Sequence, residues 1–563
     1  MTFWSLDLGS CNSAIARWNE VGQHPEMVHM PAICREQEGK IEVKYSIPSA
    51  IYPHAPRGWQ DRLGAWPFLE KRLLMGRQAL IGRAAVEEDL HQRGSGYVHG
   101  FKQALLRNSY ESLGRLGQKQ FPPQQVARLF LRELKAEVQL VSGERLRDLT
   151  IGTPVDCYEV YRAQLGEICH SLGINRPRFI DEPVAAALGY GINSGQNAPV
   201  LVLDFGAGTL DLALISMASS GFEQGHCKVL AKAGVAVGGS HVDSWVLERF
   251  CEQRAFDFRP LSDPTISWWF RAMLEEARAV KERLFFEEST HFYADPPESL
   301  RNFDALIKGQ QGLHEPFAFS RQDLVDILEE RGLMRMLESC LAQIMADAAV
   351  HGISEKHIGD VLMVGGSSLL PGVYPLMERY FGRDKVRAWQ PFHAVAFGGS
   401  VFASGNMNKS DFITHDYAFL TYNAKTHEPE HQVIIPRGTV FPTTASHWKR
   451  QLTPTCALGE PEKVFKMVIC EMGRRHQLEQ EFSWDMQGRL FRSDGAGKEE
   501  LVVALNEENP ALGFLDPPHS PADRAARLEI GFGVNKERWL TATVFDLKTR
   551  KQLMNETPVI RLK

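Results

Sequence analysis

Two short acidic segments hold the residues whose types and spacing could do chemistry. They are residues 7–12 (DLGSCN) and residues 204–211 (DFGAGTLD). In each, an aspartate ends an apolar, strand-like run, and the small residues after it let backbone N–H groups approach an anion closely. A carboxylate cannot bind phosphate directly, but it can do so through Mg²⁺ and its water ligands. The pair therefore predicts a site for a magnesium-bound phosphate group.

A third glycine-rich turn, at residues 365–367 (GGS), follows an apolar run that begins at Val361. One acidic turn alone is more often an ordinary hairpin turn, because hairpins select the same residues. Two such turns followed by a third, in this order, are poorly explained by turn chemistry alone. The repetition predicts a duplicated α/β core with one half on either side of a cleft.

The elements that must position these turns follow from hydrophobic periodicity. Residues 1–405 alternate short apolar runs with helical patterns, which indicates an α/β fold. We expect a strand on each side of both acidic turns and a helix that runs from the third turn through Tyr380. Further elements are a helix at 123–141, a strand at 149–155 and a helix near 157–172.

The pattern changes after Gly405. A polar segment at 406–418 predicts a linker, and residues 419–563 predict a β-sandwich of the usual size of one domain. Four strand patterns support this second domain, at 431–438, 463–472, 526–534 and 538–547. Two proline-rich stretches, 53–67 and 508–524, are expected to be surface loops.

Composition excludes several classes of partner and location. Lys and Arg number 63 against 69 Asp and Glu, a net charge of −6, so nothing favours nucleic acid or an anionic membrane as a partner. The 9 cysteines contain no C-x-x-C pair, which is typical of reduced thiols in the cytoplasm. The N-terminus meets Asp7 too early for a signal peptide, and aspartates interrupt the apolar stretch 200–217, so we expect no membrane span.

The order of these motifs resembles the heat shock protein 70 (DnaK-like) chaperones, within the actin–hexokinase ATPase superfamily. Residues 179–191 (FIDEPVAAALGYG) and the order of the segments make the resemblance specific to this family. The β-domain resembles it more faintly, at 433–443 and 532–549. The other matching segments are 7–13 (DLGSCNS), 81–86 (IGRAAV), 99–105 (HGFKQAL), 151–165 (IGTPVDCYEVYRAQL), 204–213 (DFGAGTLDLA), 237–243 (VGGSHVD), 363–373 (MVGGSSLLPGV) and 393–404 (HAVAFGGSVFAS).

The resemblance implies a two-lobed, actin-like ATPase domain with a duplicated ribonuclease H-like core, and catalysis of ATP hydrolysis to ADP. Asp7 and Asp204 would hold Mg²⁺ through water, and Asp204 and Glu182 would position the attacking water. Lys102 would place its charge beside the γ-phosphate, with Thr209 near it. Positioning and charge neutralisation are most of what phosphoryl transfer requires.

The resemblance also implies a nucleotide-binding set and a potassium ion near Asp211. Asp243 matches the last acid of its family motif. The nucleotide-binding positions are Gly9, Ser10, Cys11, Gly206, Ala207, Gly208, Thr209, Gly238, Gly239, Lys281, Gly365, Gly366, Ser367 and Leu369.

Several of these residues have a plainer interpretation. Taken alone, Lys102 is a solvated helix lysine, and Glu182 is an acidic first-turn residue of a helix. Cys11 has no histidine near it in sequence, so we expect a backbone role and not a nucleophilic one. Trp268 and Trp269 are expected to pack in the core.

The adenine end departs from the family. Leu369 stands where the family has an arginine that stacks on adenine, and Glu282 stands at the other cationic stacking position. Lys281 is retained, but Phe285 replaces a base-contacting serine; Phe285 or Phe286 could serve as an apolar platform. Losing a guanidinium stack removes on the order of 1–2 kcal/mol, so we expect weaker or differently shaped nucleotide binding.

The resemblance implies a client polypeptide as partner, bound by the β-domain, with a nucleotide exchange factor and, through Arg178, a J-domain co-chaperone. The linker keeps only part of the family's apolar run, and the chain has no room for a helical lid, so we expect weaker interdomain coupling and fast peptide exchange. The leading hypothesis is an ATP-driven chaperone. A non-catalytic scaffold (a pseudo-ATPase) and a small-molecule kinase are the alternatives.

Overall fold

The computed structural model divides into two compact units. Unit 1 comprises Met1–Phe381, Ala388–Met407 and Met486–Leu490, and unit 2 comprises Gly382–Arg387, Asn408–Asp485 and Phe491–Lys563. The predicted domain boundaries stay a prediction. The structure describes residues 3–36, 43–54, 77–92, 96–116, 119–155, 159–192, 198–217, 227–254, 264–294, 315–405, 411–413, 416–423, 428–436, 439–456, 460–472, 482–484, 490–492, 502–507, 510–535 and 539–562.

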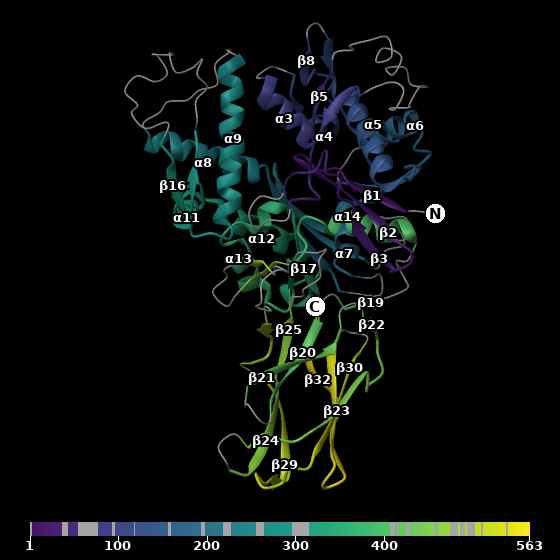
Figure 1. Ribbon diagram of the computed structural model, residues 1–563, viewed down its shortest axis with the longest axis vertical. Coiled ribbons are helices and arrows are strands. Elements are labelled where there is room, and N and C mark those ends of the chain that lie inside the picture. The colour runs from purple at the N-terminus through teal and green to yellow at the C-terminus, as the bar shows by residue number, and fades with distance from the viewer. Residues whose placement is uncertain are drawn as a thin grey trace. The chain divides into compact units, whose positions relative to one another are not determined.

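One pairing pattern occurs in both main sheets of unit 1. Figure 1 labels β1 and β2 of the first sheet and β17 of the second. In the first sheet, β1 (Trp4–Asp7) lies antiparallel to β2 (Asn12–Asn19) and parallel to β10 (Asp148–Thr153). In the second, β12 (Val200–Phe205) lies antiparallel to β13 (Leu210–Ser216) and parallel to β17 (Asp360–Val364). The strands expected around both acidic turns are therefore present. Each turn follows the first strand of its hairpin.

The remaining strands extend these sheets, and helices pack against them. The first sheet has the order β11-β10-β1-β2-β3, and β14 lies beside β13 in the second. These elements are β3 (His24–Met27), β4 (Ile47–Pro48), β11 (Arg176–Asp181), β14 (Lys228–Val235), α5 (Pro123–Ser142), α6 (Glu159–Ser171), α7 (Glu182–Gly189), α13 (Val373–Phe381) and α14 (Ala394–Ser404). The predicted helices at 123–141 and near 157–172 are confirmed by α5 and α6.

Shorter elements of unit 1 surround the two sheets. They are β5 (Ala50–Pro53), β6 (Ala79–Ile81), α3 (Arg83–Gln92), β7 (Val98–His99), α4 (Phe101–Leu106), β8 (Gly114–Leu116), β9 (Lys119–Phe121), α8 (Gly239–Gln253), α9 (Pro264–Leu284), β15 (Ser289–Phe292), β16 (Phe317–Ser320), α11 (Arg321–Glu330), α12 (Leu333–Val350), η3 (Glu355–His357) and η4 (Gly366–Leu369). The loop expected at 53–67 lies outside the described residues, apart from Pro53 and His54.

Helices α7 and α14 cross at very close range in unit 1. Helix α14 contacts β1, β2 and β10 of the first sheet, and α7 contacts β10 and β11 of the first sheet as well as β12 and β17 of the second. The crossing depends on small residues, because a Cβ atom at Gly398 would lie 1.7 Å from the Ala185 carbonyl oxygen and one at Gly189 would lie 2.0 Å from that of Ala394. The two sheets are therefore joined through a backbone-to-backbone contact.

Unit 2 is all-β in its described residues, and side chains from two sheets share one core. One sheet has the order β21-β20-β25-β28 and the other β23-β30-β31-β32. Phe419 of β20 meets Phe532 of β30 with ring centroids 5.4 Å apart, within one buried cluster. Two layers with a common core are the arrangement of a β-sandwich.

Three of the four strand patterns predicted here each match one strand, and 463–472 forms two, β24 and β25. The strands are β18 (Val386–Arg387), β19 (Asp411–Phe412), β20 (Asp416–Tyr422), β21 (Pro429–Ile435), β22 (Val440–Phe441), β23 (Trp448–Leu452), β24 (Glu462–Met467), β25 (Ile469–Met472), β26 (Phe482–Trp484), β27 (Leu490–Arg492), β28 (Val502–Ala504), β29 (Ala511–His519), β30 (Leu528–Val534), β31 (Trp539–Asp546) and β32 (Lys551–Arg561).

The prediction of a surface loop at 508–524 was wrong in the centre of that stretch, because residues 511–519 form β29. This strand pairs with β24 in a two-stranded sheet, with Phe465 opposite Gly513. Pro517 and Pro518 fall near the end of β29, in the irregular part of its pairing with β24 between Phe514 and His519, where the missing N–H groups break few ladder hydrogen bonds. The prolines therefore do not prevent the strand.

No helix among the described residues combines the length and the apolar character that a membrane span needs.

The α7–α14 crossing predicts the effect of one added methyl group. Gly398→Ala should lower the free energy of unfolding by at least about 2 kcal/mol, because the Ala185 backbone cannot move aside as a side chain could. Gly166→Ala in α6 is the matched control, since a Cβ there meets nothing within 4 Å and should stabilise the helix by up to about 1 kcal/mol. Urea unfolding followed by circular dichroism measures both. Equal stability of the two variants would contradict the close crossing.

Candidate functional site

The first acidic turn joins β1 to β2 and contains Gly9, Ser10 and Cys11. Ser49 holds it in shape: its backbone N–H donates to the Cys11 carbonyl oxygen at 2.7 Å, and its Oγ donates to the Gly9 carbonyl oxygen at 2.7 Å. Ser49 itself lies directly before β5 and is buried. The turn is therefore anchored through its carbonyl groups.

The second acidic turn, between β12 and β13, is held by two other segments. Ser367 of η4 donates its Oγ to the Gly206 carbonyl oxygen at 2.9 Å. At the start of α8, Gly239 N–H donates to the same oxygen at 3.0 Å, and Ser240 N–H donates to the Ala207 carbonyl oxygen at 2.8 Å. These contacts bring three of the predicted motifs together.

The approach of α8 to this turn requires glycine. A Cβ atom at Gly238 would lie 2.4 Å from the carbonyl carbon and oxygen of Ala207. Gln103 of α4 approaches the same turn from the other side, with its Nε2 only 2.5 Å from where a Cβ on Gly208 would stand. The turn is therefore enclosed by α4 from one half of unit 1 and by α8 from the other.

Lys102 and Glu182 form a buried ion pair beside the two aspartates. The Lys102 Nζ donates to the Glu182 Oε1 at 2.8 Å, and the side chains are only 8% and 14% exposed. Burial alone would lower the pKa of Lys102, but the charge of Glu182, with Tyr161 and Asp7 contributing less, holds it well above the usual range. The solvated interpretation of Lys102 was therefore wrong: the lysine stays charged inside the protein.

Burial disfavours the charged forms of three aspartates of the acidic turns, Asp7, Asp204 and Asp211. Burial raises the pKa of Asp7 to about 7; Lys102 opposes this rise and Glu182 adds to it. Burial likewise raises the pKa of Asp204 to about 7, with Glu182 as the next cause. Burial also raises the pKa of Asp211, although a hydrogen bond from Thr209 opposes the rise.

Four carboxylates thus share one ammonium group. Asp7, Glu182, Asp204 and Asp211 influence one another or Lys102 electrostatically, so this part of the site carries excess negative charge when all are ionised. A hard divalent cation would relieve that excess, and oxygen donors are the ligands it prefers. Among the described residues, no three His, Cys, Asp or Glu side chains converge closely enough to hold a metal directly.

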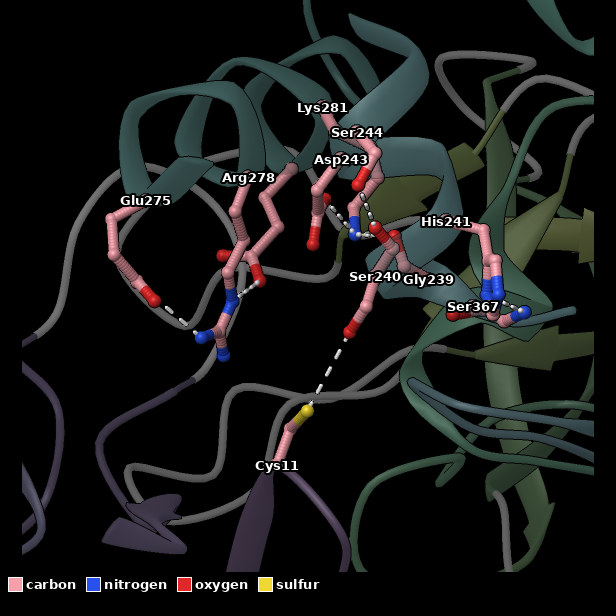
Figure 2. Close-up of polar contacts among 12 residues, drawn as sticks. Cys11, Gly239, Ser240, His241, Asp243, Ser244, Glu275, Arg278, Lys281 and Ser367 are labelled. Carbon is pink, nitrogen blue, oxygen red and sulfur yellow. Dashed lines mark hydrogen bonds and ion pairs between the residues drawn. The ribbon is translucent and has the colours of Figure 1, made fainter. Parts of the chain in front are cut away.

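Helices α8 and α9 supply a second set of charged residues near the turns (Figure 2). Lys281 forms an ion pair with Asp243 at 2.6 Å, and its Nζ donates to the Gly239 carbonyl oxygen at 3.2 Å. Figure 2 shows the Cys11 thiol pointing toward the Ser240 hydroxyl, with 3.6 Å between Sγ and Oγ. Burial raises the pKa of Asp243, and Lys281 opposes that rise.

Comparisons with known proteins follow the same motifs. The family model described as Hsp70 protein matches residues 71–478, which is more than half of the chain. The chain belongs to the Hsp70 family. It is 28% identical over 420 residues to the chaperone protein DnaK of Thermotoga petrophila, covering 69% of this chain and 67% of that protein. It is also 28% identical over 453 residues to the chaperone protein HscA homolog of Pseudomonas aeruginosa PA14, covering 78% of this chain and 64% of that protein.

Where the resemblance to the family places the adenine base, this Hsp70 chain has an ion cluster that was not predicted from the sequence. Glu282 accepts from Arg35 Nη1 at 3.1 Å and Nη2 at 2.8 Å, and from Arg278 Nε at 3.2 Å. Arg278 also donates to Asn12 Oδ1 at 3.3 Å and pairs with Glu275 at 3.5 Å. Burial opposes the charge of Glu282, but the two arginines hold its pKa far below the usual range. The pairing of Arg278 with Glu282 could have been predicted, because residues four apart on a helix are neighbours on its surface. The pairing of Arg35 with Glu282 could not, because these residues are 247 positions apart in the sequence.

Other predicted positions at this end of the Hsp70 site are buried. Leu369 and Phe285 are each 2% exposed. Trp268 and Trp269 are also buried, as predicted, and the Trp269 Nε1 donates to the Ala294 carbonyl oxygen at 3.0 Å. Gly365 and Gly366 lead into η4, and Gly365 N–H donates to the Pro391 carbonyl oxygen at 2.9 Å.

The raised pKa of Asp204 predicts how stability depends on pH. Its folded pKa, about 7, lies above its ordinary value of 3.8, so the folded state binds the extra proton between these values. The contribution of Asp204 to the free energy of unfolding therefore falls as pH rises from about 4 to about 7. Asp204→Asn should stabilise the nucleotide-free protein by roughly 1–3 kcal/mol at pH 8 and by little near pH 4.

Urea unfolding of the wild type and Asp204→Asn across this pH range measures the effect. Asp347→Asn, at an exposed aspartate of α12, is the control and should show no such trend. A variant that is less stable than the wild type at pH 8 would mean that the charged aspartate is not destabilising in the fold.

Proposed function

We propose that this Hsp70 protein binds ATP with Mg²⁺, hydrolyses it slowly to ADP, and couples that cycle to the binding and release of a client polypeptide. The observation that carries the proposal is the cluster of Lys102, Glu182, Asp7 and Asp204 beside two anchored turns. Hsp70 family members are ATPases that bind ATP and ADP with Mg²⁺ and act on client polypeptides. A two-lobed, actin-like ATPase domain is the fold that goes with this proposal.

The acidic residues suit the metal and the attacking water. Asp7 and Asp204 would hold Mg²⁺ through its waters, and Asp211 would lie near a monovalent cation such as K⁺. The metal would neutralise charge on the phosphate chain when bound. Glu182 and Asp204 would accept hydrogen bonds from the attacking water and so orient it. The raised pKa of Asp204 makes its carboxylate a better proton acceptor near neutral pH than an ordinary aspartate, and Glu182 already accepts a hydrogen bond from Lys102.

Lys102 would stabilise the charge that develops on the transferred phosphate. Its ammonium group stays charged in a buried environment, where an electrostatic contact is stronger than in water. Thr209, at the end of the second turn, would lie near the γ-phosphate. Backbone N–H groups of both turns, around Gly9 and Gly206, would bind the phosphate oxygens. Lys281 would lie toward the ribose.

The partners follow from the family and stay proposals for this chain. Unit 2 would bind an extended client peptide, since its β-sheets resemble a fold that captures peptides by main-chain hydrogen bonds. A J-domain co-chaperone and a nucleotide exchange factor would regulate the cycle. Arg178, which we propose for the J-domain contact, lies in β11 and donates to the Ala403 carbonyl oxygen at 3.1 Å.

A non-catalytic scaffold is the second candidate, and a specific observation favours it. Glu282 is engaged by two arginines and Leu369 is buried, so the adenine end differs from the pattern of the family. Calorimetric titration with MgATP distinguishes the candidates. Binding at micromolar nucleotide favours the enzyme, and a lack of binding at millimolar nucleotide favours the scaffold.

Removing the buried lysine tests catalysis directly. Lys102→Ala should slow single-turnover ATP hydrolysis by about 100-fold or more, because Lys102 is the cation that interacts with both Asp7 and Asp204 and would stabilise the transition state. Lys356→Ala, at an exposed lysine of η3, is the matched control and should hydrolyse ATP at the wild-type rate. A wild type that is no faster than Lys102→Ala would rule out catalysis by this site.

Coupling is tested with a fluorescent, apolar heptapeptide and the full chain. Adding MgATP to the peptide complex should raise the peptide's dissociation rate about tenfold or more over the rate with MgADP, because release depends on the nucleotide state. Fluorescence anisotropy measures the rate. Identical dissociation with ATP and ADP would contradict coupling, and Lys102→Ala reports whether binding of ATP alone is sufficient.

A further inference from the structure

The residues just before helix α14 pack directly against the third glycine-rich turn. The Gly365 N–H donates to the Pro391 carbonyl oxygen at 2.9 Å. A Cβ atom at Gly366 would lie only 2.5 Å from Cε1 of the Phe392 ring. The next residue, His393, is the N-terminal cap of α14. The position of the third turn therefore depends on the segment that ends at His393.

The segment around β4 has a similar relation to the first acidic turn. Tyr45, a buried residue, lies four positions before Ser49. The Ser49 N–H donates to the Cys11 carbonyl oxygen, and its Oγ donates to the Gly9 carbonyl oxygen. Between Tyr45 and Ser49, β4 pairs with the start of β2, where the turn ends. A displacement of Tyr45 would therefore also displace the residues that hold the first turn.

These two segments meet through aromatic rings. The rings of Tyr45 and His393 contact each other edge to face, with their centroids 5.7 Å apart and their planes at 80°. Phe397, one turn further along α14, places its ring centroid 5.9 Å from that of His393. All three residues are buried. This contact joins the segment that holds the first turn to the segment that holds the third.

The surroundings of His393 suit a neutral ring. Its Nε2 is buried and has no hydrogen-bond partner among the described residues. A protonated imidazole carries an N–H on both nitrogens, so a buried donor and a buried charge would be left uncompensated. Lys44 brings a positive charge close by, with its Nζ 5.0 Å from the centroid of the Tyr45 ring. Burial lowers the pKa of His393 to about 4, and Lys44 adds to this effect.

The other titratable groups at this contact come from the segments that face α14. They are Tyr45, Lys44 and His29, whose ring centroid lies 6.0 Å from that of Tyr45. Burial, Lys44 and Arg83 lower the pKa of His29. Because His29 is exposed at the surface, it can be charged while the contact stays intact. The buried His393 is therefore the group whose protonation opposes the contact.

We propose that His393 is a positioning residue of the nucleotide site: its neutral ring links the first and third turns, and its protonation in acid breaks this link and speeds nucleotide release. The inference rests on the nucleotide-binding function proposed above. When the contact opens, His393 meets water and regains the ordinary pKa of 6.5, so protons favour the open form as the pH falls. Between pH 7.5 and pH 5.5 the balance should shift toward the open form about tenfold.

Hydrogen exchange in the nucleotide-free chain tests the contact itself. The wild type is compared with His393→Phe, which keeps an aromatic ring but does not titrate, at pH 7.5 and pH 5.5. Exchange in residues 44–52 and 363–370 is expressed relative to the intrinsic rate at each pH. The ratio of opening in the wild type to opening in the variant should rise about tenfold between the two pH values. The aspartates titrate in both chains, so their effect cancels in this ratio.

Three further variants complete the exchange experiment. His393→Gln, which is polar but does not titrate, should lose the same pH dependence and covers the case in which a phenylalanine does not fit. His351→Phe, at an exposed histidine that follows α12, is the control and should behave as the wild type does. A ratio that does not change with pH would overturn the inference. Loss of the pH dependence in His29→Phe, with its retention in His393→Phe, would also overturn it.

Release of a fluorescent ADP from the full chain tests the link to the nucleotide site. The ratio of the dissociation rate in the wild type to that in His393→Phe should rise about threefold or more from pH 7.5 to pH 5.5. If the exchange ratio rises while this ratio stays constant, His393 does not position the site and the inference fails, with the proposed function left in place. A lack of nucleotide binding at both pH values would overturn the proposed function, and the positioning role with it.

Discussion

The site depends on the burial of one ammonium group among several carboxylates. Lys102 and Glu182 lie 2.8 Å apart and are largely buried, and the partly buried Asp7 and Asp204 interact with this pair electrostatically. Low polarity strengthens the attraction within the ion pair, and it also makes each additional negative charge expensive. The raised pKa values of the two aspartates are the direct result. A bound cation would offset the excess negative charge of this cluster. Metal binding would therefore also stabilise the charged carboxylates on which the proposed chemistry depends.

The rest of unit 1 keeps this cluster in place. Asp7 and Asp204 each stand in the first strand of a hairpin that also has a parallel neighbour, β10 or β17. Glu182 begins α7, which contacts the second sheet, and Lys102 lies on α4. Groups far apart in the sequence therefore meet because two similar sheets present the same end of the same kind of strand. Keeping these carboxylates charged within the fold lowers the free energy of unfolding, and the packed core of unit 1 offsets that loss.

Much of this could be predicted from local sequence. The hairpins around residues 7–12 and 204–211, the helices at 123–141 and near 157–172 and four strand patterns of unit 2 followed from periodicity and turn chemistry, because those signals lie within short windows. The pairing of Arg35 with Glu282 could not be predicted, since it depends on how residues 247 apart meet in the fold. Strand β29 was missed because its prolines outweighed its alternating apolar residues, although their position near the end of the strand leaves most of the ladder intact.

The crossing of α7 and α14 has a consequence for the substitutions that it tolerates. A Cβ atom at Gly398 or at Gly189 would overlap a backbone carbonyl group of the other helix, and backbone atoms in a packed interior cannot move aside as the end of a flexible side chain can. The main chain itself therefore sets the distance between the two helices, and any side chain at these two positions would force them apart.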